Sequence, residues 1–377
     1  MLLNIEGSVM APRGFRGAGQ GAYGLITCGL PAVCAGVYGK NHIASAPQKW
    51  TSFITSRFDV AQALFISGDK SGTFIGEEGY QGAVQLAEGC GKTLSIPSEK
   101  VLLLGAGEDG VPFTADEAED AMAALYGALS GEAEGARSVT KAFCGDAECA
   151  EIAVEFDLGD KKARIGGVCR KDRTAAVITT DVAISKEMLE RALSADAEET
   201  FFMAAPFGLL PGDMVLCMAS GMAGNKKITE EDGDYSAFCT ALRHVTGYLA
   251  KSGMALEILV NNAADKTSAT ILSKKAAQSG AVRMAVGEKR TDFASFLSAF
   301  GETDVPFDPD LMDMQIRSLS GSAQLVRNGI ALFPENTEEI FGGGALTLVA
   351  DMKNGNASAA AFTNPILRKE DENDSDR

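Results

Sequence analysis

Three threonines lie in one largely apolar stretch, RKDRTAAVITTDVAIS, at residues 170–185. A threonine hydroxyl becomes a nucleophile when a neighbouring amine accepts its proton, and that amine can be the threonine's own new N-terminus after chain cleavage. The same β-branched residue is also common in strands because its side chain packs well on a pleated surface. The residue types alone therefore allow two interpretations, a nucleophile or an ordinary strand.

Two glycine-rich segments invite a comparison with nucleotide-binding loops. GAGEDG, residues 105–110, matches GxGxxG directly after an apolar run. In a dinucleotide site the helix begins within the motif, so that its N-terminus faces the pyrophosphate; here Pro112 and a capping residue at Thr114 delay it. SGDKSGTFIGEEG, residues 67–79, lacks the GKS or GKT ending of a phosphate loop. We interpret both segments as turns and expect no cofactor.

Histidine and cysteine usage argues against a metal site. His42 and His244 are the only histidines, so a histidine-rich centre is excluded. The eight cysteines are spread singly with no CxxC pair, a pattern that indicates reduced core thiols rather than a disulfide framework or a zinc site. We expect no bound metal and eight free thiols.

Net charge and hydropathy limit the kinds of partner that the protein is expected to bind and the compartment in which it is expected. The formal charge of −17 opposes binding to phosphate backbones, which depends on clustered lysine and arginine. No window approaches the roughly 18 apolar residues that span a bilayer, and the first ten residues lack the basic flank of a signal peptide. We expect a cytoplasmic protein with neither nucleic acid nor membrane as a partner.

Strand and helix patterns alternate along the chain, which favours a mixed α/β fold with helices covering sheets. A chain of 377 residues exceeds the usual size of one domain. We expect a main domain at 1–250, a smaller C-terminal α/β domain at 251–365 and a disordered acidic tail at 366–377. The patterns predict strands at 100–104, 174–184, 255–262 and 281–287, and a strand that ends in glycines within 213–225. They also predict hairpins at 151–169 and 344–363, and helices at 114–130, 185–196, 234–252 and 268–280.

Several segments, in order over most of the chain, resemble the ornithine acetyltransferase family of arginine biosynthesis. They include SVMAPRGFRGAGQGAYGL, AVCAGVYGKNHIASAP, ALFISGDKSGTFIGEEG, VLLLGAGEDGVPFTAD, MASGMAGNKKITEEDGDYSAFCTAL and FDPDLMDMQI. The resemblance implies a layered αββα sandwich and a precursor that cuts itself before an internal threonine. That threonine then carries an acetyl group from N-acetylornithine to glutamate. The family needs no metal or nucleotide, and its fragments assemble into oligomers.

The resemblance also indicates where a catalytic pair would lie. Thr174, after Arg173, is the nearest candidate nucleophile, but it is one residue closer to the following TTD than the family's threonine is. In a strand, such a shift turns the side chain to the opposite face. Gly107 is the candidate backbone donor to an oxyanion, with Ala106 in place of the family's threonine; the loss of one such donor typically costs about 10²- to 10³-fold in rate.

Substrate contacts are altered in the same way. Lys141 in SVTKAF and Asp213 are the candidate substrate-binding residues that the resemblance supplies. Of the family's polar substrate loop only Gly208 and Asp213 remain, and the apolar Leu209 and Leu210 replace polar groups there. A charged amino-acid substrate would lose partners at these positions.

Two hypotheses follow from these residues. The first is a non-catalytic paralogue that binds an amino-acid-type metabolite in the inherited cleft, as a homo-oligomer or paired with a related, active subunit. The second is an active acyltransferase with Thr174 as nucleophile, acting on a less charged acyl donor. A fold alone does not decide between them.

Overall fold

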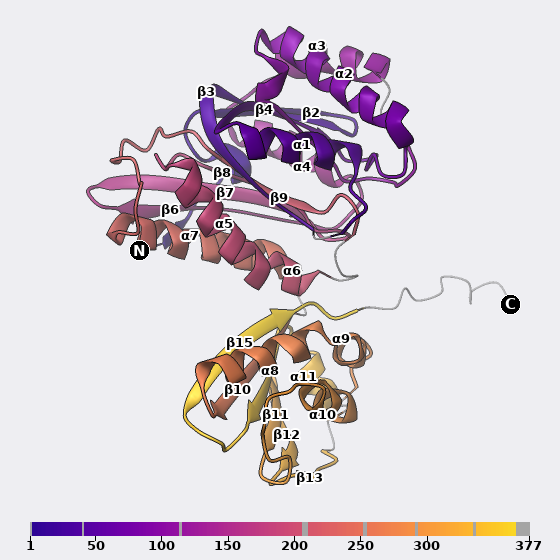
Figure 1. Ribbon diagram of the computed structural model, residues 1–377, viewed down its shortest axis with the longest axis vertical. Coiled ribbons are helices and arrows are strands. Elements are labelled where there is room, and N and C mark those ends of the chain that lie inside the picture. Colours follow the sequence, from indigo (N-terminus) through magenta and orange to yellow (C-terminus); the bar gives the residue numbers. More distant parts are fainter. Residues whose placement is uncertain are drawn as a thin grey trace, which may run out of the picture. The chain divides into compact units, whose positions relative to one another are not determined.

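The protein is described here by a computed structural model that covers residues 2–39, 41–112, 115–205, 210–251, 255–290, 293–334 and 337–366. The chain divides into two compact units (Figure 1). Unit 1 contains Met1–Phe202 and Gly208–Ala250, and unit 2 contains Met203–Phe207 and Lys251–Arg377. Apart from Ile366, the predicted acidic tail lies outside the described residues, as does the Thr114 cap.

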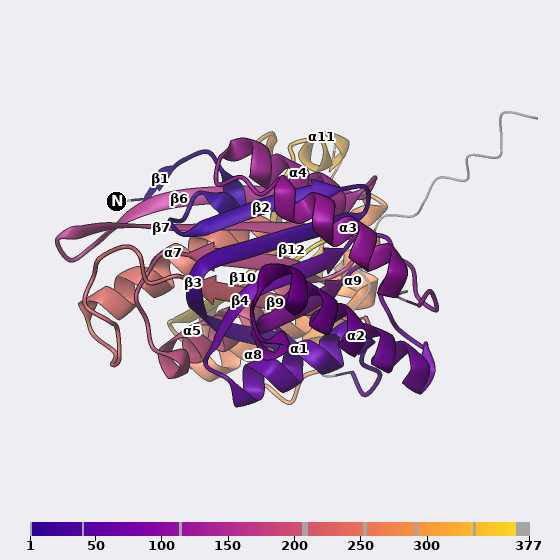
Figure 2. The same ribbon diagram turned by 90° about the horizontal axis from the view of Figure 1, so that it is seen from above.

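Within the described residues, nine strands of unit 1 form one mixed sheet (Figures 1 and 2). Its order is β1-β6-β7-β8-β9-β3-β4-β5, and β2 pairs with the first half of β3. The second half of β3 pairs instead with β9, so this long strand joins two groups of strands. The bounds are β1 Leu2–Asn4, β2 Phe15–Gln20, β3 Tyr23–Tyr38, β4 Val60–Ser67, β5 Val101–Gly105, β6 Cys149–Leu158, β7 Lys161–Arg170, β8 Ala175–Thr180 and β9 Met214–Ala219.

Helices cover the strands of unit 1. α4 packs on β2 and β3, α5 packs on β3, α7 packs on β6 and β7, and α1 packs on β5. The predicted class, a layered mixed α/β fold, is confirmed. The helices are α1 Ala46–Arg57, α2 Gly76–Leu94, α3 Ala115–Gly127, α4 Ala133–Cys144, α5 Lys186–Glu199, α6 Phe201–Ala204 and α7 Gly233–Ala250, with short 3₁₀ turns η1 Ser8–Met10 and η2 Ser98–Lys100.

Local sequence signals explain several of these elements. Ser45 and Ser185 cap α1 and α5, because each side chain accepts a hydrogen bond from the amide three residues later. The hairpin of β6 and β7 turns at Gly159, whose φ of 57° suits glycine. One face of α7 is fully buried, as its spacing predicts, through Phe238, Leu242, Val245 and Leu249.

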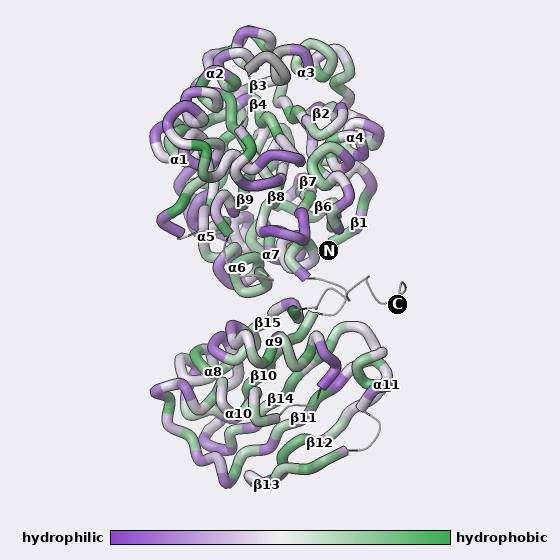
Figure 3. The backbone as a smooth tube through the Cα atoms, turned by 90° about the vertical axis from the view of Figure 1, so that its right-hand side faces the viewer, coloured by the Kyte–Doolittle hydropathy of each residue, from purple (hydrophilic) through white to green (hydrophobic). Residues whose placement is uncertain are grey.

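Unit 2 has its own six-stranded sheet among the described residues, in the order β13-β12-β11-β14-β10-β15. Figure 3 shows largely apolar (green) segments along its strands. The strands are β10 Leu256–Ala263, β11 Asp313–Ser318, β12 Gly321–Arg327, β13 Ile330–Ala331, β14 Leu346–Asp351 and β15 Ala357–Thr363, and the helices are α8 Lys266–Gln278, α9 Gly280–Gly287, α10 Phe293–Gly301 and α11 Thr337–Phe341.

Two predictions for unit 2 were wrong. Residues 281–287 form helix α9 rather than a strand, because Ser279 caps this segment and the buried Val282, Ala285 and Val286 recur at helical spacing. The segments at 344–363 do not pair with each other as a hairpin. β10 lies between them, parallel to β14 and antiparallel to β15, and satisfies the backbone groups of both.

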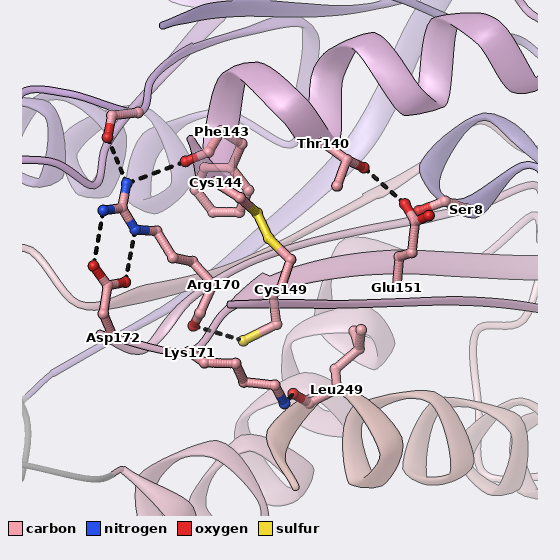
Figure 4. Close-up of a disulfide and its surroundings, with 12 residues drawn as sticks. Ser8, Thr140, Phe143, Cys144, Cys149, Glu151, Arg170, Lys171, Asp172 and Leu249 are labelled. Atoms are coloured by element: carbon pink, nitrogen blue, oxygen red, sulfur yellow. Dashed lines mark hydrogen bonds and ion pairs between the residues drawn. A yellow bond between two sulfur atoms is a disulfide. The ribbon is translucent and has the colours of Figure 1, made fainter. Parts of the chain in front are cut away.

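The prediction of eight free thiols was also wrong. Cys144, the last residue of α4, and Cys149, the first residue of β6, form a disulfide (Figure 4). Their Cα atoms are 6.2 Å apart, within the range that a disulfide bridges. The turn through Gly145, with φ of 55°, brings the two residues together although their spacing matches no CxxC motif. The free cysteines are Cys28, Cys34, Cys90, Cys169, Cys217 and Cys239.

Candidate functional site

Thr174 is the last residue of the four-residue turn that joins β7 to β8, and not a strand residue as predicted. Arg170 and Ala175 pair directly at the base of this turn. Arg170 also holds Asp172 through a 2.6 Å ion pair, and Lys171 donates to the carbonyl of Leu249 (Figure 4). The turn is therefore anchored on both sides, and the backbone of Thr174 is fixed at the entrance to β8.

Asp213 holds Thr174 in place. Thr174 is 4% exposed, and its amide donates to Oδ1 of Asp213 at 3.2 Å. The other carboxylate oxygen accepts from the amide of Leu210 at 2.8 Å, and the amide of Met214 donates to the carbonyl of Thr174 at 3.0 Å. The structure thus brings together two of the candidate residues, one from the β7–β8 turn and one from the loop before β9.

The environment of Asp213 changes its acidity. Burial raises the pKa of this carboxyl from 3.8 to about 7, although hydrogen bonds from Leu210 and Thr174 and the positive charge of Arg173 oppose the rise. A hydrogen bond from the Thr174 hydroxyl is among the contacts that lower the pKa of Asp213, so this hydroxyl faces the carboxyl. A carboxyl group that titrates near neutral pH beside a hydroxyl has the acidity of a general base.

Arg173 connects this pair to the loop that contains Gly107. Its side chain is 8% exposed, and Nη2 lies 3.6 Å from Oδ1 of Asp109. The same carboxylate oxygen accepts from the hydroxyl of Ser71 at 2.6 Å, and the hydroxyl oxygens of Ser71 and Thr73 lie 2.9 Å apart. Within the described residues, the buried Nη1 of Arg173 has no hydrogen-bond acceptor.

Gly107 lies in the loop between β5 and α3, and close packing explains why this residue is a glycine. A Cβ atom at this position would lie 1.7 Å from the carbonyl carbon of Asp69. The amide of Glu108 donates to the carbonyl of the same aspartate at 2.8 Å. The two glycine-rich loops therefore pack closely against each other. They are joined to the turn of Thr174 by the pair of Asp109 with Arg173 and by the bond from Arg170 to the carbonyl of Gly68.

The remaining candidates are spread more widely. Lys141 is exposed on the last turn of α4, and in the described part of the chain no side-chain bond joins it to Asp213 or Thr174. Leu210 lies beside Asp213, whereas Gly208 and Leu209 lie outside the described residues. The other candidate threonines are strand residues of β8, and their hydroxyls donate to backbone carbonyls: Thr179 to Val9 and Thr180 to Arg164.

Arg173 and Asp109 are the site residues that sequence reasoning missed. The signal for Arg173 was a charged side chain two residues before the wholly buried strand β8. Asp109 lies within GAGEDG, a motif whose pattern is defined by its glycines. Neither signal indicates that residues from two distant loops form an ion pair. Among the described residues, no group of three metal-binding side chains occurs, and no helix is long and apolar enough to cross a membrane.

The fold and the site together define a mixed α/β protein with a threonine–carboxyl pair at the start of a central strand. Residues 10–369 match the model of the ArgJ family, and the chain belongs to that family. Membership supports an ornithine acetyltransferase-like function in arginine biosynthesis.

Three curated relatives, each named arginine biosynthesis bifunctional protein ArgJ, are similar over most of their length. The protein from Bacillus anthracis is 27% identical over 84% of this chain and 83% of its own. The protein from Thermotoga neapolitana is 26% identical over 96% and 98%, respectively. The chloroplastic protein from Sorghum bicolor is 26% identical over 86% and 75%.

Two solved structures of the same family are more distant matches. The ArgJ crystal structure from Bacillus halodurans is 23% identical, with a TM-score of 0.43 over 45% of this chain and 93% of that chain. The ornithine acetyltransferase from Mycobacterium tuberculosis, complexed with ornithine, is 21% identical, with a TM-score of 0.39 over 41% and 89%.

Proposed function

We propose that this chain is an ornithine acetyltransferase-like protein that binds a metabolite without performing acetyl transfer. The observation that carries the proposal is the direction of the two side chains at the end of the β7–β8 turn. Arg173 reaches toward the loop of Gly107 and pairs with Asp109, whereas Thr174 directs its donors to Asp213. A guanidinium group, not a hydroxyl, therefore faces the loop from which oxyanion stabilisation would come.

Other residues of the site support the same proposal. Ala106 has no hydroxyl to donate where the family resemblance implies one, and the exposed Lys141 on α4 has no described link to Asp213. The apolar Leu210 borders the carboxyl group. Residues that act as a unit in catalysis lose their effect together, so these changes reinforce one another.

The alternative function is acyl transfer by Thr174, and the acidity of Asp213 favours it. With its pKa raised to about 7, Asp213 would be partly ionised at neutral pH and could accept the proton of the hydroxyl that faces it. The apolar Leu210 would then suit a less charged acyl donor than N-acetylornithine. Under either function we expect the chain to assemble with copies of itself or with a related subunit.

Mass spectrometry of the intact protein tests the proposal. We expect a single chain of 39.4 kDa that gains no acetyl group on incubation with N-acetylornithine. Two fragments with a new N-terminus at Thr174, or an acetyl group on that residue, would overturn the proposal and favour acyl transfer. The T174V variant is the control, because it removes the hydroxyl with little change in volume, so a genuine adduct on this residue must disappear.

A further inference from the structure

The unpaired nitrogen of Arg173 is a costly feature of unit 1. Its side chain is more than nine-tenths buried, and among the described residues Nη1 has no acceptor. A buried donor without a partner costs about 1–3 kcal/mol, and more when it is charged. Because the described residues supply no acceptor, a bound ligand can provide one.

The groups around Arg173 suit a small anion. The hydroxyl of Ser71 is linked to Arg173 through Asp109, and the hydroxyl of Thr73 lies next to that of Ser71. Asp109 is 44% exposed, and its distance of 3.6 Å from Nη2 exceeds that of a tight Arg–carboxylate bond. Asp109 is thus a weakly held, half-exposed partner of a buried guanidinium, and an external carboxylate could replace it.

We propose that Arg173 binds the carboxylate of a small metabolite, which takes the free Nη1 and displaces Asp109 from the guanidinium. This inference rests on the proposed function and names the ligand chemistry of that site. A planar carboxylate matches two guanidinium N–H groups. A dianion such as sulfate is disfavoured because Asp109 and Asp213 already place negative charge beside Arg173. The burial of Arg173 excludes an extended peptide.

Ligand binding would be coupled to the protonation of Asp213. The charged or titratable groups that face this carboxyl are Arg173, which lowers its pKa, and the buried thiol of Cys169. The positive charge of Arg173 stabilises the ionised form of Asp213, and a bound carboxylate would partly neutralise that charge. The pKa of Asp213 should therefore rise further on binding. Binding therefore takes up a proton, and affinity should fall as the pH increases through neutrality.

Calorimetric titration of the full chain tests this proposal with acetate and glutamate as probes and sulfate for comparison. We expect saturable binding of at least one carboxylate and weaker binding of sulfate. R173Q should weaken carboxylate binding at least tenfold, because about 1.5–3 kcal/mol is typical for a hydrogen bond to a charged group. R243Q is the matched control: it removes one positive charge from a side chain that is 61% exposed in unit 1, and should leave affinity within about twofold.

A second variant covers the case in which R173Q fails to fold. R173K keeps the charge but lacks the planar fork, so we expect it also to bind the carboxylates more weakly. No saturable binding by the wild type, or equal affinity in the wild type and both Arg173 variants, would overturn the inference. An acetyl group on Thr174 would instead overturn the absence of transfer and leave the role of Arg173 standing, so the two failures are distinguishable.

Discussion

At the scale of single residues, Asp213 determines how the turn before β8 is held. Its two carboxylate oxygens accept from the amides of Thr174 and Leu210, and its burial is complete. Because the ionised form is poorly solvated there, the protonated form is favoured in the folded protein more than in the unfolded chain. This difference makes the stability of unit 1 depend on pH.

We predict that the D213N variant loses that dependence. A carboxyl whose pKa is raised by folding stabilises fully below its unfolded value near 3.8, and this contribution is lost as the pH rises through about 7. Asparagine does not titrate. The free energy of unfolding of the wild type relative to D213N should therefore fall by at least about 1 kcal/mol between about pH 5 and about pH 8.

The fluorescence of Trp50 measures this change. It is the single tryptophan, it is buried in unit 1, and its indole N–H donates to the carbonyl of Val101 at 2.8 Å. D157N is the control: the pKa of the exposed Asp157 lies below its ordinary value because of Lys162, so its effect should stay constant over the same range. Parallel curves for the wild type and D213N would contradict the prediction.

We also predict that the G107A variant is destabilised by about 3 kcal/mol or more, at the upper end of the cost of overpacking. The added Cβ would meet the backbone of Asp69, which has little room to move. G127A provides the comparison, because a Cβ at Gly127, the last residue of α3, has open space around it. Its stability should be unchanged or raised by up to about 1 kcal/mol in denaturant titrations. Equal effects of the two variants would exclude the close-packing explanation.

Residue-level prediction from sequence was accurate where the signal was local. The sequence identified Thr179 and Thr180 as strand residues. The register argument assumed that Thr174 belongs to the same strand, whereas the structure places it in the preceding turn. It could not place Arg173, because the ion pair with Asp109 joins loops that are distant in sequence and only the folded sheet brings them together. Whether the site is catalytic stays a prediction.

At the scale of elements, the patterns indicated strands β5 to β10, β14 and β15 and helices α3, α5, α7 and α8, but not how they are connected. Residues 281–287 are apolar and short, and such a run is compatible with a strand or a buried helix. Ser279 caps this run at its N-terminus, and the run forms helix α9. The late strands β14 and β15 have the pattern of a hairpin, and only the presence of β10 between them excludes it. The pairing of strands depends on residues far away, which local patterns do not contain.

The junction of α4 and β6 provides a test at this scale. Because Cys144 and Cys149 form a disulfide, we predict that the chain, unfolded without reductant, reacts with six equivalents of a thiol reagent. Reduction before unfolding should raise the number to the eight cysteines of the sequence. The C144S/C149S double variant should give six under both conditions, and eight reactive thiols in the unreduced wild type would contradict the disulfide.

At the scale of the whole molecule, the chain has a separate hydrophobic core in each unit. Phe65 is buried in the core of unit 1, where its ring lies 5.6 Å from that of Tyr23, and Phe300 is buried in the core of unit 2. Because one chain contains two cores, a single two-state transition does not describe its unfolding.

We therefore predict that core substitutions act on the unit that contains them. F65A should lower the midpoint of the Trp50 fluorescence transition, with a loss of about 3–5 kcal/mol. F300A should leave the midpoint of the Trp50 transition unchanged. It should instead lower the midpoint of a separate unfolding phase, which the far-ultraviolet circular dichroism signal reports. If each variant shifts both signals equally, the two cores unfold as one cooperative unit and the prediction fails.

The position of β10 between β14 and β15 in the sheet of unit 2 has a consequence for synthesis of the protein. This strand leaves the ribosome well before β14 and β15, which supply its neighbours on both edges. Until they arrive, an apolar strand such as this one presents two rows of unpaired amides and carbonyls to other nascent chains. A stop in translation between α10 and β14 would therefore yield a polypeptide that aggregates, although unit 1 would already be complete.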